Sequence, residues 1–133
     1  MGYTETQTRA FYTNLPAGAQ RRVAAARKLL LEAHPQVKEE WKQRAIFFKL
    51  HSALAILLMA HTPPRLMFLK GHFLEAGCPL LVNGGTQYSR YVLLDSNEVL
   101  ASESFYLLIQ RAVELNLRIA QAGIKGVRRN LMH

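Results

Sequence analysis

The chain has 133 residues, half of them hydrophobic and a fifth charged, with a formal net charge of +8. This length and composition predict one folded domain over residues 1–133 and exclude a disordered chain. The polar start, the short apolar runs and the single cysteine argue against a secretory signal, a membrane helix of about 20 residues and an internal disulfide. We therefore expect a cytoplasmic protein that makes no contact with membranes.

The first predicted helix covers residues 17–34 and follows a polar lead at residues 4–14. Its apolar residues recur at three- and four-residue spacing, as Val23, Ala26, Leu30 and Ala33. This periodicity predicts one buried face. Pro16 suits the first turn of the helix, and Pro35 ends it.

Five segments have the alternation or the apolar content of strands, namely residues 37–41, 45–50, 53–60, 66–70 and 88–94. Most of the links between them are short, which predicts antiparallel pairing. Residues 53–60 are apolar on both faces and are expected to form a central strand. A long connection over residues 71–86 separates the last two strands.

A closing helix is predicted within residues 98–122, with Gly123 as its stop and a basic tail over residues 123–133. The fold class is therefore α+β. We expect an antiparallel sheet of about five strands with the N- and C-terminal helices packed on one face, and a core domain over about residues 11–122.

Two helices can cover only one face of such a sheet, so an apolar sheet face is expected to remain exposed. An exposed apolar face of this size usually marks an interaction site. The expected interface residues are Leu57, Met59, Met67 and Leu69. We predict a homodimer, with another partner on the same face as the alternative.

The positive charge favours anionic partners such as phosphorylated metabolites, nucleic acids or acidic proteins. It forms no single stripe, because Arg21, Arg22 and Arg27 spread around the first helix. We interpret most of the basic residues as a solvated surface and keep a nucleic-acid face as the alternative.

Trp41, Lys70 and Arg90 are the candidate ligand-binding residues. Lys70 ends the strand before the long connection and Arg90 begins the strand after it, so antiparallel pairing would bring two cations together. Two like charges favour an anion between them, and a guanidinium beside an indole suits a carboxylate or a phosphate. The alternative is a structural ion pair of Arg90 with Glu39, Glu40 or Glu75.

No catalytic or metal-binding motif converges in this sequence, so we expect a protein that is not an enzyme and has no cofactor. The residues that could ligate a metal lack the spacing of a zinc or haem motif: His51, His61, His72 and Cys78. The run Asn83-Gly84-Gly85-Thr86 lacks the spacing of a phosphate-binding loop, and we interpret it as a turn.

Short motifs occur in a specific order along about residues 11–116. They are Phe11…Leu15-Pro16, Pro35 with Trp41, Phe68-Leu69-Lys70-Gly71…Leu74, Leu81…Gly84-Gly85, Arg90, and Ser96…Glu98 before a helix with Ala112. In this order they resemble the small bacterial domain family called YdhG-like. The chain departs from the family pattern at Gln43-Arg44-Ala45, where the family has a proline.

The resemblance implies a frataxin-like fold and, for one branch of the family, a role as an iron chaperone. Many members have no assigned activity. Iron prefers hard oxygen ligands, whereas the first helix carries only Glu32 among basic residues and the net charge repels cations. Iron is therefore possible only through the resemblance.

Three functions are compatible with these observations. The first is a small non-enzymatic binding or adaptor domain that self-associates and takes an anionic ligand or an acidic partner. The second is a frataxin-type intracellular iron chaperone, and the third is a nucleic-acid-binding accessory protein. We favour the first.

Overall fold

An antiparallel sheet of six strands forms the centre of the structure, in the order β1-β2-β3-β4-β6-β5. The computed structural model describes the backbone of residues 2–131 and the side chains as far as Gly123. The strands are β1 (Lys38–Lys42), β2 (Ala45–Leu50), β3 (Ser52–Leu58), β4 (Arg65–Phe68), β5 (Val82–Asn83) and β6 (Arg90–Leu93). The predicted α+β class with an antiparallel sheet is confirmed.

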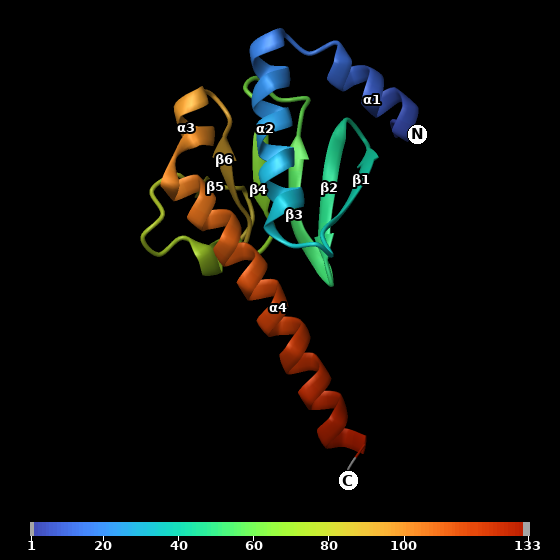
Figure 1. The fold of residues 1–133 in the computed structure, drawn as a ribbon, viewed down its shortest axis with the longest axis vertical. Helices are drawn as coiled ribbons and strands as arrows, with labels where there is room; N and C mark the ends of the chain where they lie inside the picture. The colour runs from blue at the N-terminus through green and yellow to red at the C-terminus, as the bar shows by residue number, and fades with distance from the viewer. Residues whose placement is uncertain (1, 132–133) are drawn as a thin grey trace.

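The helices are α1 (Glu5–Thr13), α2 (Ala17–Ala33), α3 (Asn97–Ala101) and α4 (Glu103–Leu131), together with the short 3₁₀ helix η1 (Gly71–Leu74). Figure 1 shows α2 and α4 on the same side of the sheet, with α1 beside β1 and the lower part of α4 extending past the strands. None of the described helices is both long enough and apolar enough to cross a membrane.

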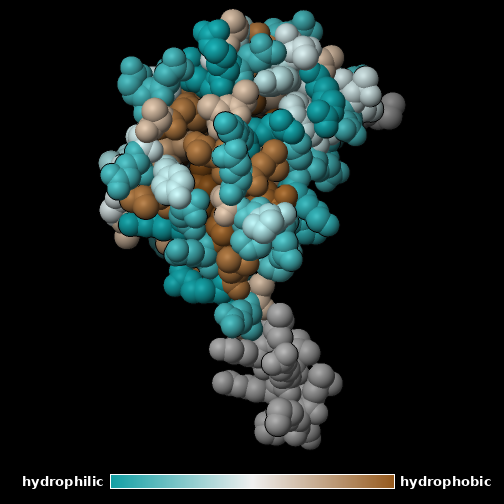
Figure 2. Space-filling view, in the orientation of Figure 1, coloured by the Kyte–Doolittle hydropathy of each residue, from teal (hydrophilic) through white to brown (hydrophobic). Residues whose placement is uncertain are grey.

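The register of the strands divides their side chains between two faces. Ile46, Leu57, Leu66 and Val92 form one row across β2, β3, β4 and β6, and each is at most 1% exposed. This row faces α2 and α4, which add Val23, Ala26 and Leu30 from one helix and Phe105, Leu108 and Ile109 from the other. In Figure 2, apolar side chains show in the seam between the two helices, surrounded by polar ones.

The polar lead expected at residues 4–14 is wrong, because most of these residues form α1. Thr4 and Gln7 make a capping box, in which each side chain bonds the backbone N–H of the other residue. Thr8 is fully buried, and its hydroxyl accepts a hydrogen bond from the backbone N–H of Arg44 at 3.2 Å. The capping box begins the helix, and the Thr8 contact holds α1 against the β1–β2 hairpin.

The closing helix differs from the expectation at both ends. A break at Ser102 separates α3 from α4, and the Ser102 hydroxyl caps α4 by accepting from the N–H of Phe105 at 3.2 Å. The expected stop at Gly123 is wrong, since α4 continues to Leu131. The tail expected over residues 123–133 is therefore helical as far as Leu131, and its last two residues lie outside the described part of the chain.

The sixth strand is β5, a two-residue segment within the long connection. It pairs with β6, where Val82 lies opposite Tyr91 and Asn83 opposite Arg90. Two residues are too few to show a period of two, so the sequence pattern gave no sign of this strand.

Candidate functional site

The candidate site is the sheet face opposite α2 and α4, which we call the open face. Its central row crosses all six strands, because register pairs place one side chain from each strand in line: Glu40, Phe47, Ile56, Met67, Tyr91 and Val82. The four residues between the ends are half-buried, and Val82 is 40% exposed. No described helix packs over this row, so the part from Phe47 to Val82 presents a continuous, largely apolar band, with Glu40 at its β1 end.

A second row of the open face carries two cations among its apolar residues, one at the β1 end and one within the row. Lys42 lies opposite Ala45, and Arg65 lies between Leu58 and Leu93. The Lys42 ammonium is 4.9 Å from the centre of the Phe47 ring, and the Arg65 guanidinium is 4.7 Å from the centre of the Tyr91 ring. Both cations therefore lie against aromatic rings of the central row.

The third row contains Lys38 and Lys49, which lie directly opposite each other on β1 and β2. Both side chains are exposed, and among the described residues neither is within salt-bridge distance of a carboxylate. Like charges in directly opposite positions destabilise a sheet. This pair therefore favours a negative group from outside the chain.

The carboxylates near these lysines already have partners. Glu40 lies 3.4 Å from the ammonium of Lys42. Glu39 points to the helix side, where its carboxylate takes two hydrogen bonds from the Arg27 guanidinium, one of them 2.7 Å long. Burial is the largest single effect on the pKa of Glu39 and opposes ionisation. The hydrogen bonds and charge of Arg27, with contributions from Trp41 and Arg9, together outweigh burial, so the pKa of this carboxyl is below its usual value.

A hollow of about 560 Å³ lies in the open face over β1, β2 and β3. Its apolar wall includes Phe47, Ala53, Ile56 and Leu69. Its charged residues are the three lysines Lys38, Lys42 and Lys49 and the two glutamates Glu39 and Glu40. A second hollow of about 510 Å³ lies next to it, shares Lys38 and Lys49 with it, and adds His51. The larger hollow has the size of ordinary ligand sites and an apolar floor. Its rim has an excess of positive charge, because both glutamates are paired within the chain, whereas Lys38 and Lys49 have no such partner among the described residues.

The structure does not bring together the three residues that the sequence indicates as a site. Trp41 lies on β1 and Arg90 on β6, and three strands separate them. The Trp41 side chain is 5% exposed and packs on the helix side, with the Tyr12 ring at 5.5 Å and the Arg9 guanidinium at 4.4 Å from its ring. Trp41 is thus a core residue of the α1–β1 contact.

Arg90 forms the structural ion pair that was the alternative interpretation. Its Nε donates to Glu75 Oε2 at 2.9 Å, and its Nη1 donates to the backbone carbonyls of Ser89 and Gln87 at 2.8 and 3.2 Å. The bond from Arg90 lowers the pKa of Glu75. Gly71 packs so closely here that a Cβ atom on it would lie 2.5 Å from the Arg90 Cβ.

Lys70 turns away from Arg90 and joins α4 to β3. Its ammonium donates to Ser52 Oγ, to the Ala53 carbonyl and to Asn116 Oδ1, at 2.9, 2.9 and 2.8 Å. The Asn116 amide in turn donates to the carbonyls of Leu50, Ser52 and Ala53. No carboxylate takes part in this cluster among the described residues, and burial lowers the pKa of Lys70.

Of the four interface residues expected from the sequence, two lie in the core and two lie on the open face. Leu57 and Met59 are 0% and 1% exposed on the helix side, so they belong to the core. Met67 and Leu69 lie on the open face, where Leu69 is 37% exposed. Residues 53–60 are apolar on both faces, so alternation alone could not show which face the helices cover.

The lysines of the open face were not indicated as site residues by the sequence. Lys38, Lys42 and Lys49 are separated along the chain by the β1–β2 turn, and only the register of the hairpin places them around one hollow. A usable signal was present, because a two-residue turn at Gln43-Arg44 fixes that register and sets Lys38 opposite Lys49.

Comparison with known proteins identifies no relative. No family model, no curated protein and no solved structure matches the chain. The YdhG-like and frataxin-like resemblance therefore stays a prediction from the sequence motifs. Among the described residues, no three His, Cys, Asp or Glu side chains converge in a way that could hold a metal ion.

Proposed function

We propose that this protein is a non-enzymatic binding module whose open face takes an acidic amphipathic segment of a partner protein. The observation that carries the proposal is the apolar part of the central row with cations on both sides of it. Among the described residues, Arg65 on one side and Lys38 and Lys49 on the other have no carboxylate within salt-bridge distance. A partner with apolar side chains flanked by carboxylates would complement both features.

The spacing of the rows supports a segment of about helical width. Lys38 and Lys42 are four residues apart on β1, which corresponds to about 13 Å along a strand. An α-helix with its side chains is about 10–12 Å across. Carboxylates on the two flanks of one helix can therefore reach the two rows of cations while the apolar stripe covers the central row.

The same charges disfavour a second copy of the chain on this face. A two-fold contact places the same surface of each copy against the other. Two open faces in contact would bring the cationic rows of both copies together, and like charges across an interface weaken it. The homodimer predicted from the sequence stays a prediction, and the charges on the open face do not support it there.

The test uses a synthetic 16-residue helical peptide with a leucine stripe flanked by glutamates, and a matched peptide with lysines in place of the glutamates. We expect the protein to bind the glutamate peptide with an affinity that falls as salt rises, and not to bind the lysine peptide. Fluorescence anisotropy of the labelled peptide measures the affinity, and amide chemical shifts locate the binding face.

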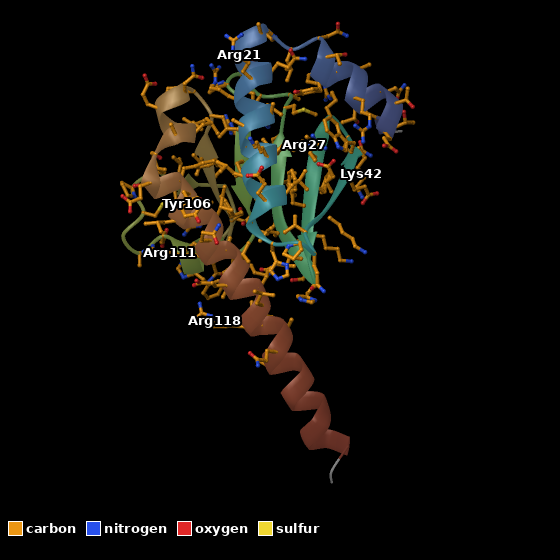
Figure 3. The ribbon with its side chains drawn as sticks, viewed as in Figure 1. Arg21, Arg27, Lys42, Tyr106, Arg111 and Arg118 are labelled. Carbon is orange, nitrogen blue, oxygen red and sulfur yellow. The ribbon has the colours of Figure 1, made fainter. Side chains whose placement is uncertain are left out.

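Charge reversal at the open face provides the matched comparison. Lys38→Glu and Lys49→Glu should each weaken binding of the glutamate peptide about tenfold, equivalent to about 1.4 kcal/mol. The control is Arg21→Glu, the same change of charge on α2, on the other side of the sheet (Figure 3). Equal losses from Arg21→Glu and from the open-face variants would contradict the proposal, because they would show a response to net charge alone.

The iron-chaperone and nucleic-acid alternatives stay predictions. The first rests on the sequence resemblance and the second on the net charge of +8. The nucleic-acid alternative is tested by adding a duplex or a single-stranded oligonucleotide as a competitor to the protein with the labelled glutamate peptide bound. Displacement of the glutamate peptide by either oligonucleotide at physiological salt would favour the nucleic-acid function over the one proposed.

A further inference from the structure

We infer that the hollow beside Ala53 takes one bulky side chain of the acidic segment, and that this side chain is aromatic. The inference rests on the proposed function and specifies its binding contact. Interfaces commonly depend on a few large side chains that fill pockets and are surrounded by contacts that exclude water. The hollow is the place on the open face where such a pocket is already formed.

The hollow lies where two small residues, Ala53 and Ala55, stand among larger ones, and only Ala53 of the two is exposed. Phe47, Ile56 and Leu69 form its walls, whereas the side chain of Ala53 ends at Cβ. The side chain of Ala53 is exposed. Its backbone is held in place, because its carbonyl accepts hydrogen bonds from Lys70 and Asn116. The empty space is therefore a fixed feature of the sheet surface, ready to accept a side chain without rearrangement.

The chemistry of the walls favours an aromatic ring over an aliphatic chain. The Phe47 ring is half-exposed at the edge of the hollow, and the Lys42 ammonium lies 4.9 Å from its centre. A ring inserted beside Phe47 can pack against it edge-to-face or offset-stacked and can also lie near the Lys42 ammonium. A carboxylate beside the inserted residue then meets Lys38 or Lys49, which have no carboxylate within salt-bridge distance among the described residues.

The experiment compares two glutamate peptides that differ only at the central apolar position, tryptophan in one and alanine in the other. We expect the tryptophan peptide to bind the wild-type protein about tenfold more tightly or better. Ala53→Leu fills the hollow. Leucine suits a strand better than alanine, and the exposed position of Ala53 keeps the change away from the core. In this variant the two peptides should bind with nearly equal, weak affinity.

Val82→Phe is the matched control, because it enlarges an exposed apolar residue at the other end of the central row. It should leave the preference for tryptophan unchanged. Equal binding of both peptides to the wild type, with loss of both in Lys49→Glu, would overturn the inference and leave the proposed function standing. Failure of both peptides to bind the wild type would overturn the proposed function as well.

Discussion

The Nε atom of Arg90 lies 2.9 Å from Oε2 of Glu75, and this contact joins the residue after η1 to the start of β6, within the long connection between β4 and β6. The Arg90 side chain is 13% exposed and also bonds the backbone of Gln87 and Ser89. Arg90 therefore has the role of a clamp for this connection.

Arg90→Ala should lower the free energy of unfolding by about 2 kcal/mol, because the carbonyls of Ser89 and Gln87 lose a charged donor. Urea denaturation measures this loss. Binding of the glutamate peptide should be unchanged, since Arg90 lies away from the hollow in the open face. A variant of normal stability that no longer responds to sulfate or phosphate would assign Arg90 to an anion site instead.

Glu39 should make the free energy of unfolding fall at acid pH. Its pKa is lowered in the folded protein, so its contribution is fully present above the ordinary value of 4.5 and is lost as the pH falls through the lowered pKa. Glu39→Gln should therefore destabilise the protein at neutral pH and flatten the decline below pH 4.5. Glu32→Gln is the control, because Glu32 is exposed and lies 4.0 Å from Lys28. Identical acid profiles for the wild type and Glu39→Gln would contradict this role.

Lys70 should make the stability of the folded protein rise with pH in the alkaline range. Burial lowers its pKa below the ordinary 10.5, so folding disfavours the charged form. The resulting penalty is present below the lowered pKa and disappears as the pH approaches 10.5, which gives a rise of stability in that window. Lys70→Met should remove this rise and should also destabilise the protein at pH 7 by about 2 kcal/mol, because Asn116 and Ser52 lose a charged donor. Thermal unfolding between pH 7 and pH 11 measures both effects.

Lys49→Glu should separate stability from binding. A glutamate opposite Lys38 replaces a repulsive cross-strand pair by an attractive one. We expect the melting temperature to rise by about 2 °C while the glutamate peptide binds more weakly. A lower melting temperature would show that the two lysines do not repel each other in the unliganded protein.

Much of the fold follows from local patterns in the sequence. The buried stripe of α2, the strands β2 and β3 and the antiparallel order were predictable, because Val23, Ala26 and Leu30 recur with helical spacing and Ile46, Phe48 and Leu50 alternate. The helix α1 was missed although its capping box, Thr4 and Gln7, is visible in the sequence.

The candidate site was harder to predict than the fold. Its residues come together only through the register of β1 and β2 and through the choice of which apolar face the helices cover. Leu57 and Ile56 are adjacent and equally apolar, yet one lies in the core and the other on the open face. Which face the helices cover depends on packing between segments far apart in the sequence, and the alternation of residues along one strand does not show it.

The length of α4 has a practical consequence for handling the protein. Asn116 is bonded to the turn between β2 and β3, and the 15 residues from there to Leu131 continue as one helix beyond the sheet (Figure 1). At 1.5 Å per residue this part is about 22 Å long. A sensor chip, a dye or a fused reporter attached at that end would stand clear of the strands, so an immobilised sample would still offer its open face to a partner in solution.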